Sequence, residues 1–533
     1  MQKRYRLFSK QLILIVTLTL FSIKGFSQAV YIPYSYDFDQ KFNAQIYALG
    51  SDLHTTLKPF LLDSTLLPRY NQLMNIGIDS TRHTWVSRII FNQHLIQVNT
   101  KDYTFYADYL PDLQLGRDVK NKVNTNLNTR GYQLGGTVGD KFFFYTSGFE
   151  NSGRFANYYN NVVNSIGFIP GQSYNRSYMP GQAPDWSYST AIVSYSPIKQ
   201  LNITLGQDKN FIGDGYRSLL LSDFAAPYPF LRVTAKLGKK VQYMAMWAYL
   251  ENDTVRKFDG FGSNRRKWGI FHYVDWNVTN RLSVGAFNAL IAAEADTSGH
   301  LHGFDANYIN PVLLLSAQGP KTPYPDNVVF GGTARYKIFD KTAIYGQFIL
   351  DRYGNSITTT TTGGYQLGIR GADVFGVKDL NYLLEYNTVK PYTYAANTTI
   401  MAYEQYNEPL ADPLGANFKE FVGLLNYSIG RFSFQGQVNY AQYGADASAA
   451  QDNGQQILKP IPVTPTTNVT GQGISTKLYY TEGTVSFLLN PKYNLRFEGN
   501  ILYRTETSSV TNTNTLLFTF GLRSTFRNLY HDF

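Results

Sequence analysis

The sequence predicts an all-β protein: a transmembrane antiparallel β-barrel of about 18 strands with a small N-terminal helical segment. Three observations lead to this fold class. The chain begins with the pattern of an export signal, its composition is aromatic and weakly charged, and its segments of alternating polarity are separated by short turns and long loops. Together they place the expected barrel in the outer membrane of a Gram-negative cell.

The first residues have the order of a secretory signal. Four basic residues within positions 1–10 precede an apolar stretch at 12–23, which is too short for a comfortable membrane span. We expect cleavage near Ser27–Gln28 and assign residues 1–28 to a signal peptide; a retained anchor helix is the alternative. The chain has no Cys, which excludes a lipid attached through cysteine, a disulfide framework and a Cys-ligated zinc site.

Composition restricts the class of protein further. Only 16% of the 533 residues are charged and 16% are aromatic, whereas soluble domains average about 25% charged residues. The formal net charge of +10 includes five basic residues of the signal segment, and the other basic residues are scattered, so we expect no nucleic-acid partner. No stretch after residue 23 reaches the roughly 18 apolar residues of a membrane helix. The two remaining classes of protein are a large exported β protein and a membrane barrel.

Alternating polarity favours the membrane barrel. At 431–441, 493–503 and 380–387, apolar or aromatic residues alternate with polar ones over about ten residues, the length of a transmembrane strand. A soluble β-sandwich would show the same alternation with its apolar face turned inward. Aromatic residues at strand ends, such as Tyr440 and Tyr493, are instead typical of the interfacial girdles of a barrel.

Turns and loops of two lengths separate these strands. Eight short turns lie at 139–140, 196–200, 238–240, 278–280, 338–341, 375–378, 430–431 and 490–492. Long connectors rich in Asn, Gly, Tyr and Pro lie at about 151–186, 209–229, 292–327, 390–418 and 442–472. Since bacterial barrels have short periplasmic turns and long outer loops, eight short turns predict nine hairpins and 18 strands. The Thr run at 358–362 and the stretch 445–473 are predicted to be flexible outer loops.

The two ends of the sequence complete the organisation. The predicted last strand has one apolar face, formed by Leu516, Phe518, Phe520, Leu522 and Phe526, and the sequence closes on Phe533. We expect this amphipathic strand to serve outer-membrane assembly, and we assign residues 101–533 to the barrel. Residues 29–100 differ, because positions 84–98 predict an amphipathic helix with Trp85, Ile89, Phe91, Leu95 and Ile96 on its apolar face. We interpret 29–100 as a periplasmic segment that plugs or braces the barrel.

The sequence lacks the common motifs of catalysis. It contains no Gly-x-Ser-x-Gly elbow, no His-Glu-x-x-His pair and no Walker loop. His300 and His302 are the only close His pair and are expected to be solvated. The loop acids Asp208, Asp214 and Asp223 would serve a glycosidase only if two carboxyls lay about 5–9 Å apart across a cleft. We therefore expect no enzyme activity, no catalytic residue, no metal and no cofactor.

The loop at 205–223 carries the residue types that a sugar site requires. Tyr216 would stack on a sugar ring while the side chains of Asp214, Arg217 and Asp223 bond its hydroxyls. The alternative interpretation is structural: the apolar run 219–221 folds inward against the barrel wall, and Arg217 and Asp214 pair with each other.

The same two interpretations stay open for residues 391–394 and 408–418. Loops that carry aromatic and charged residues on a rigid rim are the natural place for a ligand site. We therefore expect the following ligand-binding residues to face a common external cleft: Asp214, Tyr216, Arg217, Tyr392, Tyr394 and Tyr406.

Several motifs in the barrel region resemble one family. They are Asn128-Thr-Arg-Gly131, Phe144-Tyr-Thr-Ser-Gly-Phe-Glu-Asn-Ser-Gly-Arg-Phe155, Ile212-Gly-Asp-Gly-Tyr-Arg-Ser218, Asn307-Tyr-Ile-Asn-Pro311, Tyr345-Gly-Gln-Phe-Ile-Leu-Asp351, Pro409-Leu-Ala-Asp-Pro-Leu-Gly-Ala-Asn-Phe418 and Tyr530-His-Asp-Phe533. Over roughly residues 80–533, this combination resembles Wzi-like capsule-assembly outer-membrane β-barrels, in the Bacteroidota branch that includes the gliding-motility protein RemB. One position departs from the pattern: Asp412 stands where the family has His.

The resemblance implies a non-catalytic surface barrel that sits in outer-membrane lipid and binds or organises capsular polysaccharide or exopolysaccharide. Two alternatives stay open. One is a gliding-motility or secretion-associated component that works with machinery proteins, and the other is a passive porin-type channel. Apolar runs in the outer loops, at 219–221 and 311–315, favour a plugged lumen over a wide pore.

Overall fold

The structure is a computed structural model that describes residues 30–32, 34–177, 182–253, 265–295, 304–310, 327–354, 359–448, 450–462 and 468–533. The predicted signal peptide, the pair His300 and His302, and the apolar run 311–315 lie outside the described residues.

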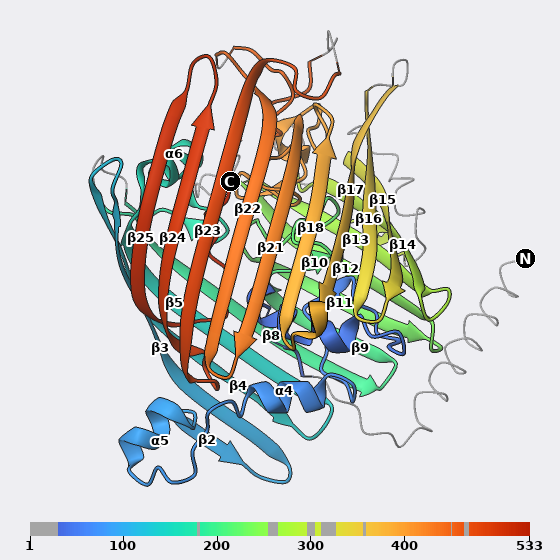
Figure 1. Ribbon diagram of the computed structural model, residues 1–533. Coiled ribbons are helices and arrows are strands. Elements are labelled where there is room, and N and C mark those ends of the chain that lie inside the picture. The colour runs from blue at the N-terminus through green and yellow to red at the C-terminus, as the bar shows by residue number, and fades with distance from the viewer. Residues whose placement is uncertain are drawn as a thin grey trace, which may run out of the picture.

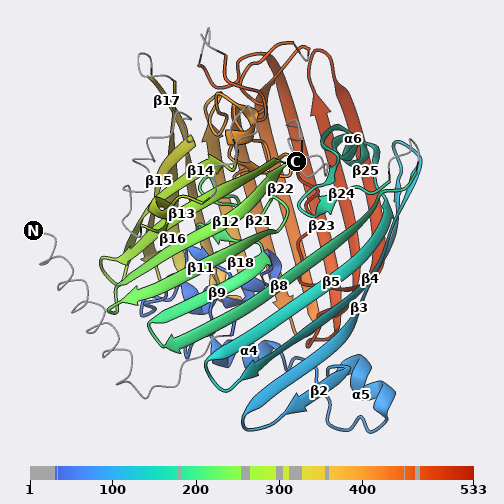
Figure 2. The same cartoon turned by 180° about the vertical axis from the view of Figure 1, so that it is seen from behind.

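The chain forms a closed antiparallel barrel of 18 strands, which confirms the predicted fold class (Figures 1 and 2). The barrel strands are β3 (Tyr103–Asp118), β4 (Val123–Val138), β5 (Phe142–Arg154), β8 (Asp185–Ile198), β9 (Leu201–Asp208), β11 (Tyr228–Leu237), β12 (Val241–Asn252), β13 (Arg265–Asn277), β14 (Leu282–Ala293), β15 (Asn327–Phe339), β16 (Thr342–Gly354), β17 (Thr359–Ala372), β18 (Leu380–Val389), β21 (Phe418–Ile429), β22 (Phe432–Ala445), β23 (Ile474–Asn490), β24 (Leu495–Thr507) and β25 (Asn512–Ser524). Pairing of β25 with β3, from Leu517 opposite Asp118 to Leu522 opposite Leu113, closes the ring.

All eight predicted short turns join consecutive barrel strands at one end of the barrel, and the long connectors join strands at the other end. The Thr run does not form an outer loop as predicted. Thr359 to Thr362 are the first residues of β17 and pair with β16, from Gly354 opposite Thr359 to Asp351 opposite Thr362. Thr is β-branched and favours the extended backbone of a strand, which explains why a polar run continues the ladder.

The outer wall of the barrel is apolar and its inner wall is polar. In β22, Phe432 and Phe434 point outward and are 46% and 41% exposed, whereas Gln437 and Asn439 point inward and are buried. This is the polarity of a barrel whose outer solvent is lipid. Among the described residues, no helix is both long and apolar enough to cross a bilayer.

Residues before the barrel form the short elements α2 (Tyr36–Asp39), η1 (Gln40–Phe42), α3 (Asn43–Ile46), β1 (Leu57–Lys58), α4 (Leu67–Leu73), α5 (Trp85–Phe91) and β2 (Ile96–Asn99). The part up to β1 lies inside the barrel, where β1 pairs with β10 (Phe211–Ile212) of an outer loop (Figure 1). Its side chains Phe38, Phe42 and Ile46 are buried in an apolar cluster.

The predicted helix at 84–98 is wrong over its second half. The Thr84 hydroxyl accepts a hydrogen bond from the Ser87 amide and caps α5, which ends at Phe91. The Asn92 side chain then donates to the Asp79 carbonyl. Residues 96–99 alternate apolar and polar with period two and form β2, which pairs with β3, because this period suits a strand rather than a helix.

Further short elements lie in the connectors: α6 (Asn157–Ile166), β6 (Phe168–Ile169), β7 (Ser173–Tyr174), η2 (Ala306–Ile309), η4 (Val374–Gly376), η5 (Thr399–Met401), β19 (Glu404–Gln405) and β20 (Glu408–Pro409). The loop at 209–227 folds into the lumen, and Leu219, Leu220 and Leu221 are fully buried there, as expected for the structural interpretation. After β25, residues 525–533 also turn into the lumen, where Tyr530 and Phe533 are buried. We call residues 525–533 the tail segment.

The closed ladder leads to a first prediction. Detergent-solubilised protein should give a circular dichroism spectrum dominated by β structure, and unboiled protein should migrate differently from boiled protein on a gel, because a closed barrel has no free edge at which unfolding starts. Recovery of the mature protein in the soluble periplasmic fraction would contradict the membrane assignment.

Candidate functional site

Arg217, one of the six residues predicted to bind ligand, is fully buried at the centre of the lumen. Its Nη2 atom donates to Oε1 of Glu420 on β21 at 3.1 Å and lies 3.0 Å from Oδ2 of Asp532 in the tail segment. Its backbone amide donates to Oε1 of Glu385 on β18 at 3.1 Å. Arg217 therefore joins an outer loop, the barrel wall and the tail segment, and the predicted pairing with Asp214 is wrong.

Asp214 is buried on the opposite side of the same loop, against the N-terminal segment. Its Oδ1 atom accepts hydrogen bonds from the Thr55 hydroxyl at 2.7 Å and the Tyr47 hydroxyl at 3.1 Å, and lies 3.5 Å from Nη1 of Arg335. Burial alone would raise the pKa of Asp214, but Arg335 and the Thr55 hydroxyl outweigh it and hold this pKa below its usual value. Asp214 is an anchor for the N-terminal segment.

The three tyrosines of the loop at 390–417 do not face an external cleft, which corrects that expectation. Tyr392 is buried, and its hydroxyl donates to the Asp452 carbonyl at 2.9 Å. Tyr394 is also buried and stacks on Tyr403 with ring centroids 5.6 Å apart. Tyr406 is half-buried against Phe168, 4.9 Å away. The loops fold inward and fill the lumen. The rings of these tyrosines are therefore packed inside the barrel instead of being exposed at its rim.

Asp412, where the sequence departs from the family pattern, is also part of this packing. Its carboxylate is fully buried, 4.0 Å from Nε of Arg217, and Oδ1 accepts a hydrogen bond from the Leu414 amide at 3.0 Å. Burial, reinforced by Glu420, raises the pKa of Asp412 well above its usual range despite Arg217. Asp412 therefore helps to hold its loop around Arg217, and its carboxylate is not accessible to a ligand.

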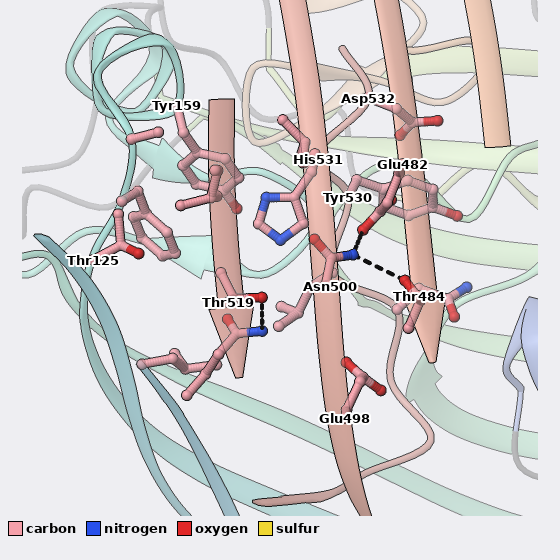
Figure 3. A pocket seen from close by; sticks show the side chains of 18 of the residues that line it. Thr125, Tyr159, Glu482, Thr484, Glu498, Asn500, Thr519, Tyr530, His531 and Asp532 are labelled. Carbon is pink, nitrogen blue, oxygen red and sulfur yellow. Dashed lines mark hydrogen bonds between the residues drawn. The ribbon is translucent and has the colours of Figure 1, made fainter. Parts of the chain in front are cut away.

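Tyr216 is the predicted residue that borders a cavity. It is half-buried, its ring meets the ring of Tyr36 edge-on at 4.8 Å, and its hydroxyl donates to Oδ2 of Asp532 at 2.9 Å. The cavity has a volume of about 140 Å³ and lies between the inner wall of β22–β25, β3 and β4 on one side and α2, α6 and the tail segment on the other (Figure 3). It is the candidate functional site.

Aromatic, amide, hydroxyl and charged side chains line the cavity together. Among them are Tyr36, Tyr158, Tyr159, Tyr216, Tyr480 and Tyr530; Gln114, Gln435, Gln437, Asn500 and Asn528; Thr125, Thr484 and Thr519; and Asp37, Arg154, Glu482, Arg496, Glu498, Arg523, Arg527 and Asp532. Sequence reasoning missed most of this set. The alternating pattern of the last strands indicates which polar residues face inward. It does not indicate that the tail segment folds back onto them.

Half-buried polar groups on the barrel wall face into the cavity. Asn500 donates to Oε1 of Glu482 and, at 2.9 Å, to the hydroxyl of Thr484 (Figure 3). The Gln114 amide donates to the Thr519 hydroxyl at 3.1 Å. These amides and hydroxyls retain further hydrogen-bonding capacity, because each of them can donate or accept more than one bond.

The charges at the end of the cavity near the short turns are mostly paired. Glu498 accepts hydrogen bonds from Nε of Arg496 at 2.8 Å and from Nη1 of Arg523 at 2.6 Å, and Nε of Arg523 also donates to Asp112 at 2.7 Å. Asp37 of α2 is exposed to the cavity although it lies deep inside the barrel, and this burial raises its pKa. This end of the cavity therefore has the Asp37 carboxyl beside a neutralised ionic network.

Two buried tyrosines leave their hydroxyls unpaired at this cavity. Tyr36 and Tyr159 are 5% and 1% exposed, and no hydrogen-bond partner for either hydroxyl exists among the described residues. Tyr159 packs beside His531, with ring centroids 5.3 Å apart (Figure 3). The accessible groups are instead the half-buried ring of Tyr216 and the wall amides and hydroxyls, which suit a ligand with apolar faces and many hydroxyls, such as a sugar ring.

The described residues show neither a metal centre nor a pair of carboxyls among the loop acids Asp208 and Asp223. No group of three or more His, Asp or Glu side chains suited to hold a metal exists in the described part of the chain. The loop acids bond to neighbouring groups instead of forming a pair: Asp208 accepts from the Lys209 amide, and Asp223 accepts from Asn528 and Tyr530. The arrangement binds and positions groups, and none of these acids forms the carboxyl pair of a glycosidase.

Comparison with known proteins supports the fold. No protein-family model matches the chain, and no curated protein matches it. Among solved structures, Wzi of Escherichia coli is similar at 13% identity with a TM-score of 0.54, over 94% of this chain and 100% of Wzi. Wzi is described as an outer-membrane protein involved in group 1 capsule assembly and as a carbohydrate-binding β-barrel. At this identity, the likeness extends to the fold alone.

Outer-membrane proteins of Pseudomonas aeruginosa are more distant. OprD is 10% identical with a TM-score of 0.41, over 78% of this chain and 94% of OprD. OpdO is 8% identical with a TM-score of 0.43, over 79% of this chain and 96% of OpdO. Similarity at this level does not bear on the function of this chain.

The filled lumen leads to a second prediction. In planar bilayers, the protein should carry little or no steady current. Arg217→Met leaves the buried carboxylates of Glu420 and Asp532 without their cation, so we expect a loss of about 3–5 kcal/mol of stability and the appearance of current. Lys120→Met, at an exposed position in the loop between β3 and β4, is the control and should change neither the thermal midpoint nor the current. Large, stable openings of the unmodified protein would contradict the filled lumen.

A third prediction concerns His531 of the tail segment. Burial lowers the pKa of His531 to about 4, whereas an unfolded His titrates near about 6.5. Between these values the unfolded chain binds a proton that the folded chain does not, so this contribution to stability is lost as pH falls from about 6.5 to about 4. His531→Asn should show a smaller drop in thermal midpoint between pH 7 and pH 4.5. Equal drops in both proteins would show that His531 does not set this dependence.

Proposed function

We propose that the protein is an outer-membrane barrel that binds or organises surface polysaccharide without catalysing a reaction, in the manner of Wzi-like proteins. The observation that carries this proposal is the cavity beneath α6, where the half-buried ring of Tyr216 lies near half-buried amides and hydroxyls of the barrel wall. Its partners would be outer-membrane lipid around the wall and a capsular polysaccharide or exopolysaccharide at the cavity.

The size and chemistry of the cavity support a single sugar unit as the ligand. A cavity of about 150 Å³ accommodates a molecule the size of benzene, which has half the heavy atoms of a hexose, so about 140 Å³ suits part of one saccharide unit. The half-buried Tyr216 supplies aromatic surface, while Asn500 and Thr484 supply groups that bond hydroxyls. A polysaccharide held by one of its units would remain attached to the cell without being cleaved.

The alternatives are weaker on the same observations. Three described segments, namely the N-terminal segment, the loop at 209–227 and the tail segment, occupy the lumen, which speaks against a wide passive channel. A gliding-motility or secretion-associated role stays a prediction. Deletion of the gene distinguishes the two roles when cell-attached polysaccharide and surface motility are both measured in the same strain. Loss of motility with a normal amount of polysaccharide would favour a role in the gliding or secretion machinery.

A fourth prediction tests the cavity with two adjacent residues of one strand. Thr484 lines the cavity, whereas its neighbour Val485 points away from the lumen and is 48% exposed. Thr484→Trp should fill the cavity and weaken binding of polysaccharide extracted from the producing cells by about tenfold or more, a loss of roughly 1.4 kcal/mol. Val485→Trp should bind normally, and both variants should keep heat-modifiable migration. Undiminished binding by folded Thr484→Trp would exclude this cavity as the site.

A further inference from the structure

The unit formed by α5 and β2 projects beyond the barrel at the end of the short turns (Figures 1 and 2). Neither element contains a buried residue. Its exposed side chains are large and apolar: Trp85 is 64% exposed, Val86 54% and Ile96 52%. Exposed apolar surface of this kind marks a site of contact with another molecule or with a membrane.

The register of β2 shows which way part of this surface faces. Ile96 is opposite Ala107 and Val98 is opposite Phe105 of β3. Residues that are directly opposite in an antiparallel pair project from the same face of the sheet. On β3, this is the face of the exposed Tyr103 and Tyr109, which is the outer, lipid-facing wall of the barrel. The apolar side of β2 is therefore continuous with that wall.

The remaining residues of β2 show the complementary pattern. Gln97 and Asn99 project from the opposite face, next to the partners Tyr106 and Thr104. An irregular, solvated hairpin would not need to separate its apolar and polar side chains in this way. The separation matches a strand that lies at a boundary between lipid and water.

The unit is held in place by the turn between β23 and β24. The Asn490 side chain donates to the carbonyls of Ile89 at 2.7 Å and Gln93 at 2.9 Å, and the Tyr493 hydroxyl donates to the Ile89 carbonyl at 3.1 Å. On the β2 side, the Leu95 amide donates to Asp108 of β3 at 2.9 Å. The apolar surface is thus a fixed part of the fold.

We propose that α5 and β2 form a foot that rests in the headgroup region of the inner, periplasmic leaflet, with Trp85, Val86, Ile96 and Val98 inserted toward the acyl chains. The short turns mark the periplasmic end of the barrel. Trp and aliphatic side chains are favoured at the boundary between headgroups and acyl chains. The inference rests on the proposed placement of the barrel in a membrane, but it is independent of polysaccharide binding.

The absence of Cys from the sequence permits a direct test. Single-cysteine variants Val86→Cys, Ile96→Cys, Gln97→Cys and Leu367→Cys are labelled with the fluorophore NBD and reconstituted in phosphatidylethanolamine and phosphatidylcholine vesicles that contain nitroxide-labelled lipid. Leu367 is an exposed residue of the barrel wall and reports on membrane insertion itself. Gln97 is the matched control on the polar face of β2.

We expect NBD at positions 86 and 96 to emit at shorter wavelength and to be quenched by nitroxide near the headgroups at least about twofold more than NBD at position 97. Water-like, unquenched emission at positions 86 and 96, together with quenching at position 367, would show that the barrel is in the membrane but that α5 and β2 do not contact lipid. The proposed foot would then be wrong, and a periplasmic protein would be the expected partner of this surface. Unquenched emission at all four positions would overturn the membrane placement along with the foot.

Discussion

An 18-stranded barrel encloses more space than the side chains of its own strands can fill, because barrels of this size leave a channel unless other parts of the chain enter it. The rest of this molecule is arranged around that constraint. The N-terminal segment, the inward-folded loops and the tail segment enter the lumen, and Arg217 ties an outer loop to the wall through Glu420 and to the tail segment through Asp532. The buried guanidinium thereby satisfies acids from different parts of the chain, which would be costly to bury alone.

The candidate site lies where this filling is incomplete. The inner wall of β22–β25 is polar because it is the inner face of a membrane barrel, and the segments that cover it bring aromatic rings such as Tyr159 and Tyr216. A polar wall and an aromatic cover are therefore brought together by the architecture. The cavity does not depend on the exposed loop tips, where a surface protein is usually searched for its ligand site.

Local patterns in the sequence predict the parts of the fold that depend on local chemistry. Gly430 at a short turn, with φ of 56°, and the alternation along β22 identify a hairpin without knowledge of its neighbours. The partners of Arg217 are not predictable in this way, because Glu420 and Asp532 are 203 and 315 residues away. The same holds for Tyr394, whose aromatic ring suggests a sugar platform in sequence but stacks on Tyr403 in the packed lumen. The predicted helix at 84–98 is wrong for another reason. The apolar residues of this stretch have helical spacing at its start and strand spacing at its end.

The seam between β25 and β3 has a consequence for how the molecule is made. It joins residues that are 398 or more positions apart, such as Leu516 and Asp118, and it spans only Leu113 to Asp118 on the β3 side. Hairpins form between neighbours and are quick to assemble, whereas a ladder of such high contact order forms late, since the loop-closure entropy has to be overcome first. The tail segment begins directly after β25 and ends inside the lumen. We therefore expect this short seam to close late in folding, so that the lumen stays laterally open to the tail segment until then.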